Sequence, residues 1–219
     1  MKGRGSTSTT AREPRRDDAT DLRIDPAGYA RGVRQVHSPN CDARPPGTAI
    51  TLAVIHGISL PPGRFGGGDV ERLFTNTLDT SAHPFYGSLA GLRVSAHFFV
   101  RRDGSIVQFV ACGARAWHAG VSTWEERARC NDYSIGIEVE GADNIAYEDG
   151  QYQRLARLLR ALRRRYPLTA AVGHSDVAPG RKTDPGPAFD WPRLARLVRA
   201  RLLHRDRDGR LPGSPAAVV

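Results

Sequence analysis

The apolar residues of this chain come in short runs, and the longest covers only seven residues, 49–55, with Thr51 inside it. A run of this length beside turn residues is typical of a buried strand, whereas a helix that crosses a membrane needs about 20 apolar residues. Further strand-like segments lie at 94–100, 105–110, 133–140 and 170–172. The Asp103-Gly104 pair between two of them predicts a hairpin turn, so one pair of strands is expected to be antiparallel.

Leucines and arginines recur at helical spacing in two later segments, which predicts amphipathic helices at 151–165 and 191–203. A shorter helix is expected at 69–76, with Asp69 as its N-cap. Because a strand hairpin and strands separated by helices occur in the same chain, we predict an α+β fold with a single domain. Its architecture would be a central mixed β-sheet flanked by helices.

The two ends of the chain differ from its middle. Residues 1–28 are rich in Ser, Thr, Arg and Asp without any periodicity, and we expect a flexible N-terminal arm there. Residues 205–219 are interrupted by prolines and glycines, which favours a disordered C-terminal tail. Residues 29–204 are then the folded domain.

The first 30 residues contain no apolar stretch of the roughly 7–15 residues that a secretory signal requires. The cysteines Cys41, Cys112 and Cys130 are odd in number and have no Cys-x-x-Cys spacing, so no disulfide framework is expected. Both features favour a cytoplasmic protein. We also expect a monomer.

The formal net charge is +9, from 32 basic and 23 acidic residues, and such an excess can indicate nucleic-acid binding. The basic residues concentrate at 154–165 and 193–210, where they recur at helical spacing opposite leucines. That pattern is typical of the solvent-facing side of an amphipathic helix. No RNA-binding aromatic motif, zinc-finger spacing or leucine zipper accompanies the charge, so neither nucleic acid nor a membrane is expected as a partner.

Two histidines lie where strand-like runs end. His56 directly follows the run 49–55, and His174 follows the run 170–172 after one glycine. Asp184 lies ten residues after His174 in a loop rich in glycine and proline, which can fold both residues onto one ion. Two imidazoles and a carboxylate form a three-ligand zinc site with an open fourth position. The spacing alone leaves a second interpretation open, in which the histidines are core residues and the loop is only a turn.

Acidic and basic candidates lie in the same segments. Lys182 is the one lysine away from the N-terminus, and its compact ammonium comes two residues before Asp184. Glu138 and Glu140 have the same parity in the strand-like segment 133–140, so both face one side of the strand. The residues alone do not choose between these two glutamates.

Six motifs follow one another in the chain. They are Ile55-His56-x-Ile58-Ser59-Leu60-Pro61-Pro62-Gly63-x-Phe65-Gly66-Gly67, Leu92-Arg93-Val94-Ser95-Ala96-His97, Ala116-Trp117-His118-Ala119-Gly120, Arg129-Cys130-Asn131-Asp132, Ser134-Ile135-Gly136-Ile137-Glu138-x-Glu140-Gly141, and the segment from Gly173-His174 to Trp191. In this order they resemble the AmpD family of zinc amidases, which shares its fold with phage amidase-lysozymes and peptidoglycan recognition proteins. The resemblance extends from about residue 29 to about residue 199 and leaves out both ends.

The resemblance implies a cytoplasmic hydrolase of peptidoglycan recycling. Its substrates would be small muropeptides, in which it cleaves the amide between the lactyl group of (1,6-anhydro)-N-acetylmuramic acid and L-alanine. It implies one zinc ion per chain, held by His56, His174 and Asp184, which favours the metal interpretation of these residues. It also implies Glu138 and Lys182 as the catalytic pair.

The resemblance further implies a substrate pocket lined by Arg93, Trp117 and Arg129. One position departs from the family pattern, because the family usually has asparagine where this chain has Gly57. We therefore expect a substrate hydrogen bond to be missing there. The segment 57–68, rich in glycine and proline, is predicted to be mobile and to gate the zinc.

Two alternative functions stay open. The first is an amidase of intact cell-wall peptidoglycan, against which the missing signal segment and wall-binding repeats argue. The second is a peptidoglycan recognition protein without catalysis. The presence of all three ligand types together with Glu138 and Lys182 argues against this second alternative.

Overall fold

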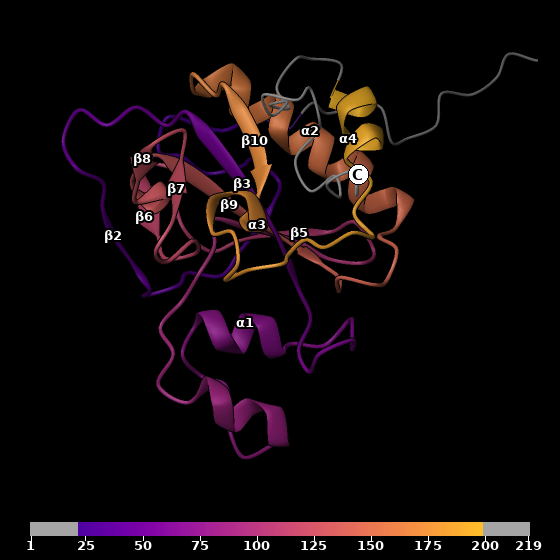
Figure 1. Ribbon diagram of the computed structural model, residues 1–219. Coiled ribbons are helices and arrows are strands. Elements are labelled where there is room, and N and C mark those ends of the chain that lie inside the picture. The colour runs from indigo at the N-terminus through magenta and orange to yellow at the C-terminus, as the bar shows by residue number, and fades with distance from the viewer. Residues whose placement is uncertain (1–21, 199–219) are drawn as a thin grey trace, which may run out of the picture.

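The computed structural model describes residues 22–198, and Figure 1 shows their central sheet with helices on either side. Six strands lie in the order β1-β5-β4-β9-β3-β10. Their bounds are Arg34–Gln35 (β1), Leu52–Ile58 (β3), Phe98–Val100 (β4), Ile106–Gln108 (β5), Ser134–Glu140 (β9) and Ala170–Gly173 (β10). β4 and β5 are antiparallel, as the Asp-Gly turn predicted, and the other neighbouring strands are parallel. The predicted α+β fold with one mixed sheet is therefore confirmed.

The central strands β3 and β9 are covered on both faces, and every residue of β9 is buried. On one face, the isoleucines and valine of β9 pack against two helices, α2 (Asp149–Arg165) and α4 (Trp191–Val198). On the other face, Gly136, Glu138 and Glu140 lie beside Val54, His56 and Ile58 of β3. The sheet thus holds polar side chains on an enclosed face, opposite the helices α2 and α4.

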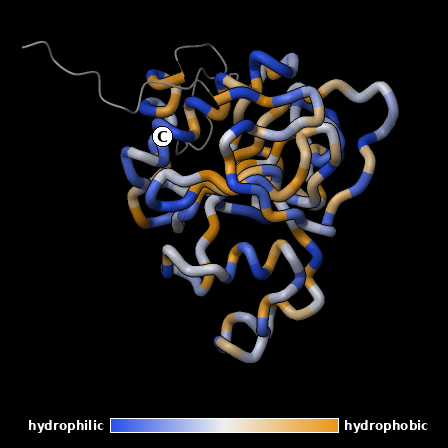
Figure 2. Tube along the Cα trace, turned by 180° about the vertical axis from the view of Figure 1, so that it is seen from behind, coloured by the Kyte–Doolittle hydropathy of each residue, from blue (hydrophilic) through white to orange (hydrophobic). Residues whose placement is uncertain are grey.

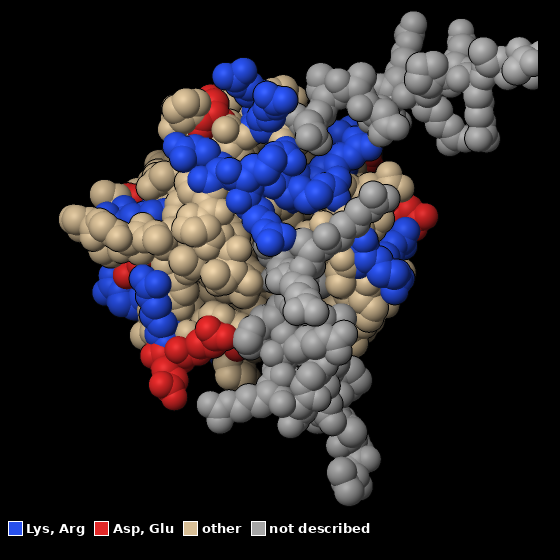
Figure 3. All heavy atoms as spheres, turned by 90° about the horizontal axis from the view of Figure 1, so that it is seen from above, with Lys and Arg blue, Asp and Glu red and all other residues tan. Residues whose placement is uncertain are grey.

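Helix α2 has the amphipathic character that the sequence predicted. Its leucines are buried against the sheet, whereas the arginines of its last turn, 163–165, are exposed. The side chain of Gln151 accepts a hydrogen bond from the Glu148 backbone N–H at 2.9 Å, which stabilises the start of the helix. Pro167 prevents its continuation. Figure 2 shows the hydrophobic residues along the central strands, and Figure 3 shows Lys and Arg gathered over the side where α2 and α4 lie.

Helix α1 (Asp69–Phe74) packs on the face opposite α2, where Val70, Leu73 and Phe74 join the cluster that contains Phe99 and Val107. Its N-cap is Gly68 rather than Asp69, which is the first helical residue instead. A carboxylate in the first turn is still favourable, because the amide groups there carry partial positive charge.

Several short elements were not predicted, because two or three residues carry no readable periodicity. Two small sheets pair β2 (Cys41–Ala43) with β6 (Ala114–Ala116) and β7 (Thr123–Trp124) with β8 (Arg127–Ala128). A short helix α3 (His174–Val177) follows β10 directly. Two 3₁₀ helices, η2 and η3, cover Pro84–Leu89 and Cys130–Asp132.

Residues 22–28 belong to the fold rather than to a flexible arm. Leu22 and Ile24 pack against the main hydrophobic cluster, and Ile24 forms a β-bridge with Ala30. The Gly28 carbonyl accepts from the Cys112 N–H at 3.0 Å. These contacts exist because two apolar side chains reach a hydrophobic surface that the local sequence does not reveal. Residues 1–21 and 199–219, which include the rest of the expected arm, the end of the helix predicted at 191–203 and the tail 205–219, lie outside the described residues.

Cys41, Cys112 and Cys130 are free thiols, as expected from their number and spacing. In the part of the chain that the structure describes, no helix has the length and the apolar character needed to cross a lipid bilayer.

Candidate active site

Three side chains from separate parts of the fold converge at one end of the sheet. His56 lies inside β3 and not at its end, because Gly57 and Ile58 continue to pair with β9. His174 is the first residue of α3, directly after β10. β10 is the parallel neighbour of β3, with Gly173 opposite Ile55, so the two imidazoles come side by side. Asp184 reaches the same place from the loop after α3.

The ligand atoms of these three residues lie within 4.8 Å of one another. Nδ1 of His56 is 2.9 Å from Nδ1 of His174, and Oδ2 of Asp184 is 3.3 Å and 3.1 Å from these two nitrogens. An ion held tetrahedrally by bonds of about 2.0–2.1 Å separates its ligand atoms by about 3.3 Å. The residues that the sequence analysis grouped are thus brought together in a geometry that fits one divalent cation.

The electrostatics of two of these groups, His56 and Asp184, favour the protonation states that a metal requires. Burial and the neighbouring His174 lower the pKa of His56 to about 4, so its imidazole is neutral at pH 7. Burial opposes ionisation of Asp184, but the close contacts of its carboxylate with His174 and His56 hold the pKa of this carboxyl well below its usual range. A neutral imidazole and an ionised carboxylate are the forms that bind metal ions.

A cavity of about 630 Å³ opens beside these residues. One wall is the segment after His56, including Gly57, Ser59 and Leu60. Hydrophobic side chains line another part of it, among them Phe74, Phe85, Leu89 and Leu92. A mixed polar and apolar cavity of this size is typical of a small-molecule site.

Glu138 and Lys182 both line this cavity. Glu138 is 8% exposed and lies opposite His56 in the β3–β9 pairing. Burial raises the pKa of Glu138 well above its usual range, the Asp184 carboxylate raises it further, and the Lys182 ammonium opposes the shift. A glutamate with a raised pKa is suited to accept and donate a proton.

Glu140 has a different environment, although it faces the same side of β9. Its carboxylate accepts hydrogen bonds from the backbone N–H of Gly66 at 2.6 Å and of Arg102 at 2.8 Å. It does not line the cavity. The structure therefore separates two glutamates that the sequence left equivalent. The hydrogen bond from Gly66 to Glu140 also connects the segment 57–68 to β9. The mobility of this segment stays a prediction.

Comparison with known proteins agrees with this geometry. The family model described as N-acetylmuramoyl-L-alanine amidase matches residues 46–187. The chain belongs to the N-acetylmuramoyl-L-alanine amidase family. This amidase is 58% identical over 173 residues to 1,6-anhydro-N-acetylmuramyl-L-alanine amidase AmpD of Escherichia coli (strain K12), an alignment that covers 78% of this chain and 94% of the relative.

Two further relatives support the same assignment. The enzyme of the same name from Haemophilus influenzae is 45% identical over 175 residues, which cover 78% of this amidase and 95% of the relative. The crystal structure of a Se-Met AmpD derivative matches with a TM-score of 0.78 and 53% identity, and covers 81% of this chain and 99% of that chain.

The expected substrate residues of this amidase differ in whether they line the cavity. Gly57 lines the cavity, whereas Arg93, Trp117 and Arg129 are not among its lining residues. Arg93 is exposed and adjoins two lining residues, Leu92 and Val94. Trp117 is half-buried beside His118, which does line the cavity. Arg129 is exposed and forms an ion pair with Asp132 at 2.9 Å.

Sequence reasoning missed Tyr147, which explains why residue 57 is a glycine. A Cβ on Gly57 would lie 2.4 Å from the Tyr147 hydroxyl, and a Cβ on Gly141 would lie 2.2 Å from the Tyr147 ring. The hydroxyl donates to the Pro185 carbonyl at 2.9 Å, next to Asp184. The space that an asparagine side chain would need is therefore occupied by a buried tyrosine that also contacts the loop carrying Asp184.

Proposed function

We propose that this chain is a zinc-dependent amidase that acts on cytoplasmic muropeptides in peptidoglycan recycling. The bond cleaved is the amide between the lactyl group of 1,6-anhydro-N-acetylmuramic acid and L-alanine. The observation that carries the proposal is the convergence of His56, His174 and Asp184 beside Glu138 in an amidase fold. Support for the substrate comes from a relative, 58% identical, whose name specifies a 1,6-anhydro-N-acetylmuramyl-L-alanine amidase.

His56, His174 and Asp184 would hold one zinc ion per chain. Two neutral nitrogens and one carboxylate oxygen suit zinc, and three protein ligands leave a position open, as in catalytic zinc sites. Zinc held by these residues would act as a Lewis acid and would supply a water nucleophile at neutral pH by lowering its pKa towards about 7.

Glu138 is the proposed proton carrier. Its carboxyl accepts the proton of the attacking water and then delivers it to the departing nitrogen of L-alanine. The raised pKa of Glu138 favours both roles, because a carboxylate with a higher pKa is a stronger base and its protonated form persists to higher pH. General acid–base catalysis of this kind contributes about 10²–10⁴ in rate.

Lys182 is the proposed stabiliser of the tetrahedral oxyanion. Its ammonium lines the cavity and is close enough to influence the pKa of both His56 and Glu138. Fixed positive charge near the developing oxyanion typically contributes about 10²–10³ in rate.

The exposed guanidinium groups of Arg93 and Arg129 are proposed to bind the peptide carboxylates of the substrate outside the cavity. The Trp117 ring is proposed to contact the sugar or the peptide. Planar guanidinium groups bind carboxylates with two parallel hydrogen bonds. At Gly57 no side chain contacts the substrate, and the space beside its Cα is taken by the Tyr147 hydroxyl. We propose that the enzyme acts as a monomer.

The test is incubation of the purified chain with anhydromuramyl-tripeptide, with and without a chelator, followed by mass spectrometry. Release of free tripeptide that stops with chelator and returns with Zn²⁺ is the expected result. Intact sacculi form the second arm of the experiment. Turnover of sacculi but not of the soluble compound would identify a wall amidase, and binding of either without product would identify a recognition protein.

A further inference from the structure

One dipeptide, His118-Ala119, contacts both histidines of the candidate metal site. Nδ1 of His118 lies 3.0 Å from Nε2 of His56, with the two rings edge to face. The carbonyl oxygen of Ala119 lies 3.3 Å from Nε2 of His174. Both contacts therefore involve the ring nitrogen on the far side from Asp184, since Asp184 faces the two Nδ1 atoms.

With a metal bound, these contacts favour one proton position on each ring. When His174 binds a metal through Nδ1, its proton lies on Nε2, where the Ala119 carbonyl oxygen can accept it. When His56 binds a metal through Nδ1, its proton lies on Nε2 and is donated to Nδ1 of His118. His118 then carries its own proton on Nε2, 3.1 Å from the Ser134 hydroxyl. Ser134 in turn donates to the Cys130 carbonyl at 2.6 Å, so every donor meets an acceptor.

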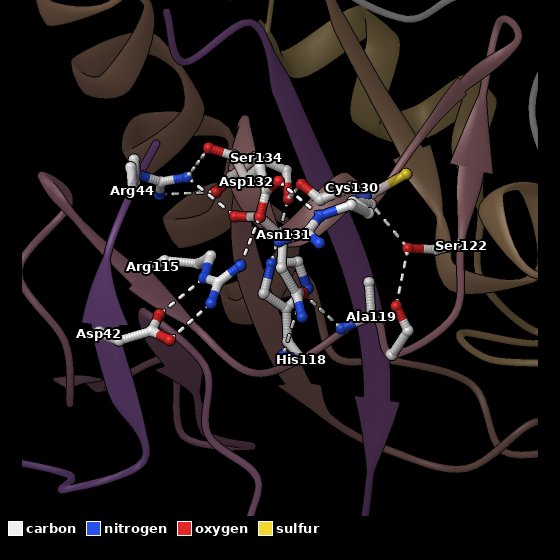
Figure 4. Close-up of polar contacts among 12 residues, drawn as sticks. Asp42, Arg44, Arg115, His118, Ala119, Ser122, Cys130, Asn131, Asp132 and Ser134 are labelled. Carbon is white, nitrogen blue, oxygen red and sulfur yellow. Dashed lines mark hydrogen bonds and ion pairs between the residues drawn. The ribbon is translucent and has the colours of Figure 1, made fainter. Parts of the chain in front are cut away.

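The dipeptide is itself held from several directions, and Figure 4 shows it beside Asn131 and Ser134. The side-chain oxygen of Asn131 accepts from the backbone N–H groups of His118 at 3.2 Å and Ala119 at 2.8 Å. Arg181 donates to the Ala119 carbonyl at 2.8 Å.

The strand beneath the His118 ring also makes room for it. A Cβ on Gly136 of β9 would lie 2.4 Å from Cγ of His118. Only a residue without a side chain lets the imidazole lie against the sheet beside His56. The position of His118 is therefore determined both by the hydrogen bonds of its own loop and by the glycine in the central strand β9.

We propose that His118 and Ala119 are positioning residues of the metal site, with Asn131 as their anchor, and that together they set the tautomer and orientation of both imidazole ligands. The inference rests on the proposed function in one respect, because it requires a divalent metal at His56, His174 and Asp184. Partners that accept the outer N–H of metal-binding histidines typically change metal affinity about 10–100-fold.

The main experiment compares two replacements of His118 in the full chain. Asparagine keeps a side-chain oxygen close to the position of Nδ1 and can accept from His56, whereas leucine accepts nothing. We expect His118→Leu to weaken Zn²⁺ binding about 10–100-fold in competition with a chromophoric chelator. His118→Asn is expected to restore most of the affinity.

Two further measurements separate positioning from a general structural role. With Co²⁺ as the probe, the visible absorption bands should change in His118→Leu and keep the wild-type pattern in His118→Asn. Asn131→Leu should weaken Zn²⁺ binding, whereas Asn131→Asp retains an oxygen that accepts both backbone N–H groups and should not. His37→Asn, a change at an exposed histidine, is the control for both.

Equal Zn²⁺ affinity and equal Co²⁺ spectra in the wild type and in His118→Leu would overturn the inference. If circular dichroism shows that His118→Leu does not fold, the Asn131 pair decides instead, and equal Zn²⁺ affinity of its two members overturns the inference. A wild-type chain that binds no Zn²⁺ would contradict the proposed function itself, so the two failures are distinguishable.

Discussion

Glu138 and Glu140 show how much the surroundings of a side chain decide its role. Both project from the same face of β9 and both are buried. Glu140 satisfies its charge with two backbone N–H groups, which fixes the segments around Gly66 and Arg102. Glu138 lines the cavity beside His56 and has a raised pKa. Hence one glutamate stabilises the fold and the other is available for chemistry.

Replacing these two glutamates should therefore have opposite consequences. Glu138→Gln is expected to lower kcat about 10²–10⁴-fold, because the amide cannot carry the proton, with Zn²⁺ affinity and folding stability little changed. Glu140→Gln is the matched control and should lower the free energy of unfolding by about 1–3 kcal/mol. Steady-state kinetics and urea denaturation distinguish them. An active Glu138→Gln variant would contradict the role assigned to Glu138.

At the scale of elements, the site depends on contacts between strands and the loops above them. Tyr147 lies against Gly57 at the end of β3 and against Gly141 just after β9, and it donates to the carbonyl next to Asp184. His97 similarly accepts from the Gly136 N–H of β9 at 3.0 Å, immediately before β4. Arg44 donates to carbonyl groups of Asn131, Asp132 and Ser134 and so fixes the segment that contacts His118 and Ala119 (Figure 4).

The contact between Gly57 and Tyr147 predicts a coupled pair of substitutions. Gly57→Ala should lower the free energy of unfolding by about 1–3 kcal/mol, because the new methyl group overlaps the tyrosine hydroxyl. In the double variant with Tyr147→Phe the hydroxyl is gone, so the loss should be smaller than the sum of the two single losses. Urea denaturation of the four proteins measures this coupling, and strict additivity would show that the overlap has no energetic consequence.

The buried His97 predicts how stability depends on pH. Burial and the nearby Arg44 lower its pKa to about 3. The unfolded chain protonates this histidine below about pH 6.5, while the folded chain does not until about pH 3, so acid favours unfolding. His97 therefore removes about 1.4 kcal/mol of stability for each pH unit below 6.5.

His97→Asn should make the pH dependence of stability shallower by this amount. The free energy of unfolding of the metal-free protein is measured by urea denaturation between pH 4.5 and 6.5. His37→Asn, whose side chain is exposed, should leave the slope unchanged. An unchanged slope in His97→Asn would mean that this imidazole is already protonated in the folded protein.

At the scale of the whole molecule, folding creates the candidate metal site. His56 and His174 are 118 residues apart in the chain and meet only because β3 and β10 pair in parallel. The unfolded chain cannot hold the three ligands together. A metal that binds only the folded state stabilises it by about 4 kcal/mol at a free concentration of 1,000 times its Kd.

Metal removal should accordingly lower thermal stability. Addition of chelator is expected to lower Tm by about 8–16 °C, since 1 kcal/mol corresponds to about 2–4 °C for a chain of this size. Asp184→Asn should abolish most of this response, whereas Asp149→Asn, which removes an exposed carboxylate outside the cavity, should keep it. Differential scanning calorimetry checks all three proteins. Identical Tm values with and without chelator in the wild type would contradict a metal bound at this site.

The sequence by itself determined the local elements and the types of ligand. Short apolar runs, the Asp-Gly turn and the leucine spacing are signals between near neighbours, and they suffice for β3, the β4–β5 hairpin, β9 and α2. The residue types allowed a metal site, since two imidazoles and a carboxylate can hold zinc, and the family resemblance favoured this interpretation over buried core histidines. Local patterns are informative here because strand and helix periodicity follow from backbone geometry alone.

Only the tertiary structure decided which side chains meet. Four features depend on contacts between segments distant in the chain. They are the different surroundings of Glu138 and Glu140, the packing of residues 22–28, the tyrosine beside Gly57, and the contacts of His118-Ala119 with both imidazoles. No local pattern carries this information, because strand order and register are fixed by the packing of the whole core. The residue types thus determine which ligand atoms are available, and the pairing of the strands determines where these atoms lie.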